Sequence, residues 1–280
     1  YRSYFPVYFG KMAVNWHVSN NFGDLLSVYI AKKLSGFDIH NVSEDSNFLH
    51  YQIVGSILSS ANKNSLVWGS GFVNKTDSFI SKPKKIYMVR GEYSLEKCRK
   101  LGVINDVALG DPGYILSRLY CPKKISKNYT LGIIPHWVDY EICRDLFKDR
   151  ADVLVINLLN SNIEAVIDQI TSCEKCISSS LHGLIVSHSY NIPCMYVTFS
   201  DRILRTGLKK FNIVGDGMKF LDYFSSVKIP IYTPPEIAHL DAFDDITNAI
   251  PTNCGDKNQI NKMIAACPFI KIPLVKNAYY

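Results

Sequence analysis

Apolar and polar positions alternate in short blocks along this chain, and Gly, Pro, Ser or Asn bound most of the blocks. Short apolar runs predict strands, whereas apolar residues spaced three or four apart predict helices. In the first half the pattern predicts strands over residues 4–8, 52–54, 65–68, 86–89 and 106–109. It predicts helices over residues 24–34, 93–101 and 113–119. The segment from residue 9 to 23 reads as a long polar loop, and Gly36 is expected to end the first helix.

The same alternation returns after a polar break over residues 121–128. It predicts strands over residues 130–134, 153–156, 176–179 and 195–198 and helices over 138–147, 163–172 and 184–190. Strands that alternate with helices are typical of parallel sheets, so the expected class is α/β with two doubly wound halves facing a cleft. The expected domains are residues 1–125, 126–255 and a tail, 256–280, whose helix near 258–266 folds back onto the first half.

Composition narrows the class of protein further. The chain has 280 residues, of which 47% are hydrophobic and 20% charged, with a net charge of +6, and this composition is typical of a globular protein. It contains no RNA-binding, zinc-finger or helix-turn-helix signature, so no nucleic-acid partner is expected. Of eight cysteines only Cys173 and Cys176 have metal-ligand spacing, and no second pair follows, so no metal is expected. The cysteines do not have the regular spacing of a disulfide framework, which favours a reducing compartment. The sequence shows no signal-peptide pattern and no apolar run long enough to cross a membrane, so a cytoplasmic protein is expected.

The most informative segment runs from Ile177 to Val186 and reads as a buried strand that turns into a helix at His182. In open α/β sheets, ligands bind where strands end and helices begin. Backbone N–H groups and the helix dipole favour an anion at such a turn. His182 would then stand beside the anion, although a buried, hydrogen-bonded histidine is the alternative interpretation of this segment.

Two glycine-containing segments in the first half have both functional and structural interpretations. Asp24 is expected to cap the first helix, and either Asn21 or Asp24 could instead contact a substrate hydroxyl. Gly69, Ser70 and Gly71 follow a strand and permit either a close approach of backbone to ligand or a tight turn. Their spacing is neither that of a P-loop nor that of a dinucleotide fingerprint.

Four further positions lie at predicted strand or helix ends. Arg90 could hold a carboxylate or phosphate with its planar fork, or form a surface ion pair. Gly110-Asp111-Pro112 most simply makes a turn. His136 is either a substrate contact or a packed imidazole. Lys219 is either a surface lysine or a point charge for a phosphate.

Taken in order, these segments resemble the polysaccharide pyruvyl transferase family. The resemblance covers roughly residues 4–226 and rests on Asn21-Phe22-Gly23-Asp24, Trp68-Gly69-Ser70-Gly71, Arg90-Gly91, Gly110-Asp111-Pro112, Gly132 to His136, Ser179 to Gly183, and Lys219-Phe220 with Asp222-Tyr223. It implies a GT-B-like fold of two Rossmann-like domains. It also implies phosphoenolpyruvate as co-substrate and a cyclic pyruvate ketal formed on two hydroxyls of a polysaccharide or its precursor.

The resemblance also implies roles for these residues. His182 would be the general acid, a function worth ~10² to 10⁴ in rate, and Asp24 or His136 would deprotonate the acceptor. Arg90 and Lys219, with Ser180, Leu181 and Gly183, would hold the donor. Asn21, Gly69, Ser70 and Gly71 would face the acceptor. No cofactor or metal is required, because side-chain cations can neutralise the donor.

One position departs from the family pattern. Some members carry arginine where this chain has Ser180, so Arg90, or Arg202 and Arg205 in the following loop, would have to supply that charge.

A polyprenyl-linked acceptor would bring the enzyme to the inner face of the membrane. The alternatives are a GT-B glycosyltransferase that uses a nucleotide sugar and a non-catalytic carbohydrate-binding relative.

Overall fold

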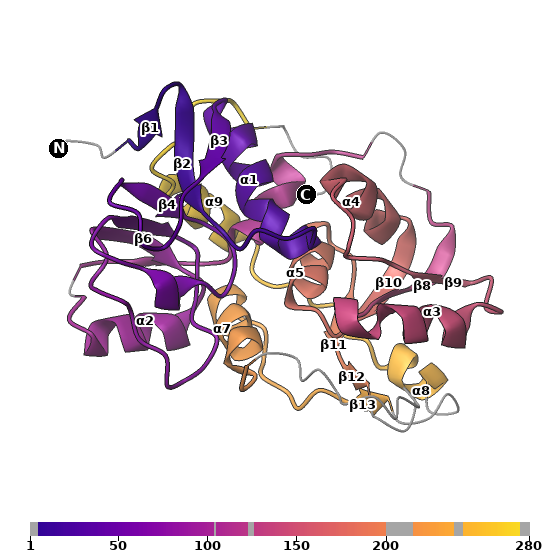
Figure 1. The fold of residues 1–280 in the computed structure, drawn as a ribbon. Helices are drawn as coiled ribbons and strands as arrows, with labels where there is room; N and C mark the ends of the chain where they lie inside the picture. The colour runs from indigo at the N-terminus through magenta and orange to yellow at the C-terminus, as the bar shows by residue number, and fades with distance from the viewer. Residues whose placement is uncertain (1–4, 104, 123–125, 200–214, 238–242, 275–280) are drawn as a thin grey trace.

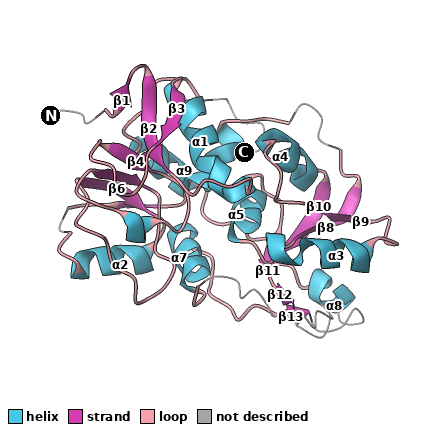
Figure 2. Cartoon of the chain, viewed as in Figure 1, coloured by secondary structure: helices cyan, strands magenta, loops and turns pink. Residues whose placement is uncertain are grey.

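The computed structural model describes residues 5–103, 105–122, 126–199, 215–237 and 243–274. The protein is a mixed α/β structure whose two main sheets are built from parallel strands, as the alternating sequence pattern predicts. The two sheets lie on opposite sides of the molecule with helices α1 and α5 between them (Figure 1; Figure 2).

Within the described residues, the first sheet contains seven strands. The order is β3-β2-β4-β5-β6-β7 with all pairs parallel, and β1 pairs antiparallel with β2. The strands are β1 (Val7–Tyr8), β2 (Lys11–Asn15), β3 (Asp38–Asn41), β4 (His50–Gln52), β5 (Ser65–Trp68), β6 (Lys85–Val89) and β7 (Ala108–Leu109).

The second sheet is parallel throughout the part of the chain that the structure describes. Its order is β11-β10-β8-β9, formed by β8 (Tyr129–Ile134), β9 (Val153–Val155), β10 (Cys173–Ser178) and β11 (Cys194–Tyr196). Strand β10 lies in the middle of this sheet and is hydrogen-bonded to β8 on one side and to β11 on the other. This pairing holds the end of β10, and therefore the start of the turn after it, in a fixed position. A short parallel pair, β12 (Thr198–Phe199) with β13 (Glu236–Ile237), lies beside this sheet.

The helices cover the sheets and bring distant parts of the chain together. They are α1 (Phe22–Ser35), α2 (Glu92–Lys100), α3 (Tyr140–Phe147), α4 (Ile163–Thr171), α5 (Leu181–Ser189), α7 (Met218–Val227), α8 (Phe243–Asn248) and α9 (Asn258–Ala265), with 3-10 turns η1 (Leu58–Ser60), η2 (Pro112–Arg118) and η3 (Trp137–Asp139). Helix α7 packs against α2, and α9 packs against β7 and η2. Leu26, Ile115 and Ile185 belong to one buried cluster, so α1, η2 and α5 share a core.

The structure differs from the sequence prediction mainly between residues 9 and 41. Strand β2 lies where a polar loop was predicted, and edge strand β3 was not predicted at all. The chain reverses at Phe9 and Gly10, both with positive φ (50° and 76°), which is the two-residue turn that a tight hairpin requires. Pairing with three other strands then overrides the weak propensity of β2.

The first helix also begins earlier than predicted. Asn21, and not Asp24, is its N-cap, because the Asn21 side chain accepts a hydrogen bond from the Gly23 N–H at 2.9 Å. Gly36 ends the helix in the left-handed conformation, as predicted.

Candidate active site

Most of the residues singled out by sequence follow the carboxyl ends of parallel strands. Ser70 follows β5, Arg90 follows β6, Asp111 follows β7, His136 follows β8, and His182 follows β10. Strand ends of this kind place side chains from separate segments along one edge of a sheet. The local geometry decides which of them come together.

His182 occupies the first turn of α5, and its side chain is half-buried, with the Nε2 atom buried. Ser178 shapes the turn before it: its hydroxyl donates to the Ile134 carbonyl at 2.8 Å and accepts from the Ser180 N–H at 3.0 Å. Gly23 lies against the ring so closely that a Cβ at that position would come within 2.0 Å of His182 Nδ1. The glycine of the first-helix motif is therefore required by contact with the histidine of the second sheet.

The electrostatic surroundings of His182 are positive. Burial, and then Lys219, Arg90 and His136 in that order, lower the pKa of His182 to about 3. The imidazole is thus neutral at physiological pH. Its Nε2 is buried and has no hydrogen-bond partner among the described residues. Among the described residues, this nitrogen therefore lacks the hydrogen bond that the alternative interpretation of the segment expects.

His136 and Lys219 form part of the same group. Burial and the charge of Lys219 lower the pKa of His136 to about 4, and its Nδ1 is a second buried nitrogen without a hydrogen-bond partner in the described chain. The His136 backbone N–H donates to Ser179 Oγ at 2.8 Å, which ties this loop to the turn before α5. Burial and Arg90 lower the pKa of Lys219 to about 8, so Lys219 is not an ordinary surface lysine.

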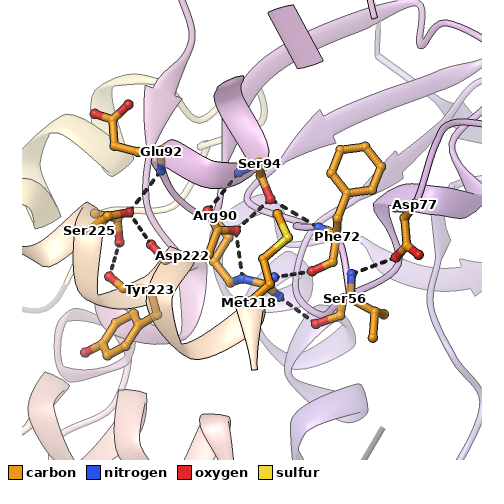
Figure 3. A network of polar contacts seen from close by, with 12 residues as sticks. Ser56, Phe72, Asp77, Arg90, Glu92, Ser94, Met218, Asp222, Tyr223 and Ser225 are labelled. Carbon is orange, nitrogen blue, oxygen red and sulfur yellow. Dashed lines mark hydrogen bonds and ion pairs between the residues drawn. The ribbon is translucent and has the colours of Figure 1, made fainter. Parts of the chain in front are cut away.

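Arg90 is completely buried and lies at the centre of a polar network (Figure 3). Its Nε donates to Asp222 Oδ2 at 3.2 Å, its Nη1 to Ser56 Oγ at 2.6 Å and its Nη2 to the Phe72 carbonyl at 2.5 Å. Both partners of the Arg90–Asp222 ion pair have side chains with 0% exposure. The alternative of a surface ion pair is therefore wrong, and the residue also fixes α7 to the first sheet.

Asp222 has a role that sequence reasoning missed. It accepts hydrogen bonds from the Ser94 N–H at 2.9 Å and the Ser94 hydroxyl at 2.6 Å, besides pairing with Arg90 (Figure 3). Its partners lie more than 120 residues away in the sequence, so no local spacing could have identified them. The juxtaposition of the Arg90 and Asp222 segments is visible only in the fold.

Asp111 makes the predicted turn, because its Oδ1 accepts from the Gly113 N–H at 2.9 Å and caps η2. The side chain is fully buried, and burial raises its pKa to about 6 while Arg90 opposes the shift. Its other oxygen, Oδ2, has no hydrogen-bond partner within the described residues. Sequence reasoning assigned only the turn and did not anticipate this unpaired oxygen.

The residues predicted for the acceptor side are only partly available to a ligand. Asn21 is used as the helix cap. Asp24 is half-buried, which raises its pKa, and it accepts from Ser19 Oγ at 2.6 Å. Ser70 Oγ is buried and lacks a hydrogen-bond partner in the described chain. Gly71 lies against Arg90, where a Cβ would come within 2.5 Å of the guanidinium carbon.

The turn before α5 is held mainly by packing. A Cβ at Gly183 would lie 2.6 Å from both an Ile134 methyl and Ser178 Oγ, so this glycine permits close contact between α5 and β8. Leu181 is buried, and the Ser180 side chain makes no cap hydrogen bond to α5. Arg202 and Arg205, the alternative cations for the donor, lie outside the described residues.

The comparisons with known proteins identify the family of the chain. The model of the family "Polysaccharide pyruvyl transferase" matches residues 17–201, so the chain belongs to that family. The chain is 35% identical over 212 residues to uncharacterized protein L143 of Acanthamoeba polyphaga mimivirus, covering 73% of this chain and 70% of that protein.

A second relative is the succinoglycan biosynthesis protein ExoV of Rhizobium meliloti (strain 1021). It is 29% identical over 158 residues, which cover 54% of this chain and 48% of ExoV. No solved structure matches the chain. In the described part of the chain, no helix has the length and apolar character needed to cross a membrane.

Proposed function

We propose that this protein transfers pyruvate from phosphoenolpyruvate to two hydroxyls of a glycan and forms a cyclic ketal. The observation that carries the proposal is the convergence of Arg90 and Lys219 on two half-buried imidazoles, His136 and His182, each with one buried ring nitrogen. Besides burial, Lys219 and Arg90 lower the pKa of His182, Lys219 lowers that of His136 and Arg90 lowers that of Lys219, so positive charge is disfavoured in the empty site and an anionic ligand is favoured. Family membership supplies the reaction class.

The donor site would be the region around Lys219, Arg90 and the amino end of α5. Phosphoenolpyruvate carries a carboxylate and a phosphate, close to three negative charges. Lys219 offers a point charge, and the backbone at Ser180, Leu181 and Gly183 offers the positive end of a helix dipole. Arg90 contributes its charge from within the ion pair with Asp222, so it acts more through its field than as a two-pronged clamp.

His182 would protonate the methylene carbon of the donor. In the free protein the imidazole is neutral, because burial and neighbouring cations depress its pKa. A bound trianion compensates these cations and raises the pKa toward the ordinary value of about 6.5. Binding of the donor would thereby allow His182 to carry the proton that it then transfers. The proton moves from His182 to the methylene carbon, and the resulting cationic centre at C2 accepts one acceptor hydroxyl.

The remaining steps release phosphate and close the ring. Phosphate leaves C2, the second acceptor hydroxyl adds, and the two hydroxyl protons pass to basic groups. Asp24 and His136 are the candidates for this role: burial raises the pKa of Asp24, and His136 has an unpaired ring nitrogen. A positioned general base of this kind typically contributes about 10² to 10⁴ in rate.

We also infer the GT-B arrangement, with residues 1–125 and 126–255 as two Rossmann-like domains and 256–280 as a tail on the first. The first parallel sheet lies between residues 7 and 109 and the second between 129 and 196, which supports this division. For the tail, the support is the Trp68 Nε1 hydrogen bond to the Met263 carbonyl at 3.1 Å.

The test measures phosphate release from phosphoenolpyruvate with galactosyl, mannosyl and glucosaminyl acceptors. Turnover should depend on both substrates and disappear in His182→Gln, whereas His40→Gln, an exposed histidine on β3, should keep it. Thermal stabilisation by a nucleotide sugar, but not by phosphoenolpyruvate, would favour a glycosyltransferase instead. Saccharide binding without phosphate release would favour a non-catalytic relative.

A further inference from the structure

A polar pocket lies at the carboxyl ends of β2, β3 and β4, in a part of the first sheet that the family motifs do not include. Its volume is about 330 Å³, at the lower end of the ~300–1,000 Å³ that is typical of small-molecule sites. Asn15 ends β2 and Trp16 follows it, Asn41 ends β3, and Ser56 and Ser60 follow β4.

The pocket wall is held rigidly by side chains behind it. Gln52 is fully buried, and its amide donates to Asn15 Oδ1 at 3.1 Å and to Ser60 Oγ at 2.9 Å. Asn15 in turn donates to the Val42 carbonyl at 2.8 Å, and Asn41 Oδ1 accepts from the Trp16 N–H at 3.4 Å. Gln52 Oε1 is buried without a hydrogen-bond partner among the described residues. A fixed array of amides and hydroxyls suits a ligand with many hydroxyl groups.

The charge of the pocket is opposite to that of the donor site. None of the described residues that line it is lysine or arginine, and one of them, Glu44, is an exposed acidic residue. A trianionic donor would therefore avoid it. Trp16, half-buried in the lining, offers an aromatic face that can pack against the C–H face of a pyranose ring.

The pocket borders the candidate active site at two places. Ser56, in its wall, accepts the 2.6 Å hydrogen bond from Arg90 Nη1 (Figure 3). His17, also in its wall, interacts electrostatically with Asp24, which lies next to Gly23 and hence to the His182 ring. A ligand in the pocket could thus extend hydroxyls toward both Asp24 and the donor cations.

We propose that this pocket binds the acceptor as an uncharged pyranose, with Trp16 packed on the ring and Glu44 accepting hydrogen bonds from its hydroxyls. The inference rests on the proposed pyruvyl transfer for its role in catalysis, but it predicts saccharide binding in its own right. It differs from the sequence expectation, which put the acceptor at Asn21 and at residues 69–71.

The experiment compares Trp16→Ala, Trp16→Phe and Glu44→Gln with the wild-type protein. Binding of methyl galactoside, methyl mannoside and methyl N-acetylglucosaminide is measured by ligand-observed NMR, with and without phosphoenolpyruvate. Phosphate release then gives the KM for each substrate. Phe9→Ala, which truncates a fully exposed aromatic at the β1–β2 turn outside the pocket, is the matched control.

For the best acceptor, Trp16→Ala should weaken binding and raise KM at least tenfold. Trp16→Phe should largely restore both, and Glu44→Gln should raise the acceptor KM severalfold. The KM for phosphoenolpyruvate should stay within twofold throughout, and Phe9→Ala should match wild type. Unchanged acceptor binding and KM in both Trp16→Ala and Glu44→Gln would overturn the inference while leaving pyruvyl transfer intact. So would failure of the wild type to bind any pyranoside. Saccharide binding that depends on Trp16, without phosphate release, would instead refute the proposed function alone.

Discussion

The contact between Gly23 and His182 gives the sharpest test of the candidate active site. Replacing Gly23 with alanine adds a single methyl group. Built on the existing backbone, that methyl carbon would lie 2.0 Å from Nδ1, 2.6 Å from Cε1 and 2.7 Å from Cγ of His182. Ordinary contacts begin near 3.4 Å, so the ring or helix α1 must move by more than about 1 Å.

The expected changes in stability and in kcat for Gly23→Ala follow from two opposing effects on folding and one effect on catalysis. Alanine in place of a helical glycine stabilises by about 0.5–1 kcal/mol, whereas overpacking a buried contact costs about 1–3 kcal/mol. The net loss of about 0–2.5 kcal/mol leaves the protein folded. Displacing a catalytic group by ~1 Å costs about 10²-fold in rate. We therefore expect kcat to fall about a hundredfold in Gly23→Ala.

The assay is phosphate release from phosphoenolpyruvate at saturating acceptor, accompanied by urea unfolding. Gly10→Ala serves as control for an added methyl group away from His182, because Gly10 has nothing within 4 Å of that methyl, although its φ of 76° adds backbone strain. It should alter stability only. A folded Gly23→Ala protein with wild-type kcat would refute the idea that the position of His182 matters for catalysis.

Three further predictions concern charge and stability. First, the Lys219 ammonium, whose pKa is about 8 in the free protein, loses its charge as pH rises, so calorimetric affinity for phosphoenolpyruvate should fall as pH rises above about 8. Lys219→Arg should shift that decline to higher pH, and a flat wild-type profile would contradict the assignment. Second, Asp222→Ala leaves Arg90 buried without its counter-ion, so the free energy of unfolding in urea should drop by about 3–5 kcal/mol. Adding Arg90→Met should recover part of the loss, and a drop below about 1 kcal/mol would show that the pair is dispensable. Third, His182, His136 and His188 have pKa values of about 3, 4 and 4, below the unfolded value of about 6.5. The unfolded chain therefore binds more protons, and stability should be lost as pH falls from about 6.5 toward 4. Each His→Gln variant should lessen that loss, and identical pH slopes in all variants would disprove the explanation.

How far the sequence predicts the fold depends on the range of the interactions that form each element. Strand β5 lies at its predicted residues, and α4 ends one residue early, because buried apolar runs and clear helix periodicity are local signals. The prediction of a polar loop at β2 was wrong, because its five residues form a strand only through pairing with three other strands. Its hairpin turn at Phe9 and Gly10 does not match the common Asn-Gly pattern.

In the candidate site, too, local sequence signals predicted some features, and contacts between distant segments determine the others. His136 and His182 were predicted from their positions after the carboxyl ends of strands. Each has one buried ring nitrogen without a hydrogen-bond partner among the described residues. Sequence alone could not predict that Arg90 is already engaged by Asp222, because that ion pair joins segments 132 residues apart. Nor could it identify the polar pocket, which is assembled from the ends of three strands and not from one motif.

The buried ion pair also explains why Lys219 lies where it does. Lys219 and Asp222 are three residues apart on α7 and therefore share one face of that helix. Asp222 holds this face against α2 and β6 through Arg90 and Ser94. The same contact brings the Lys219 charge close enough to lower the pKa of both His182 and His136. An arginine that cannot itself reach solvent thus sets the position of the lysine that we propose binds the donor, because one helix carries both the counter-ion and the cation.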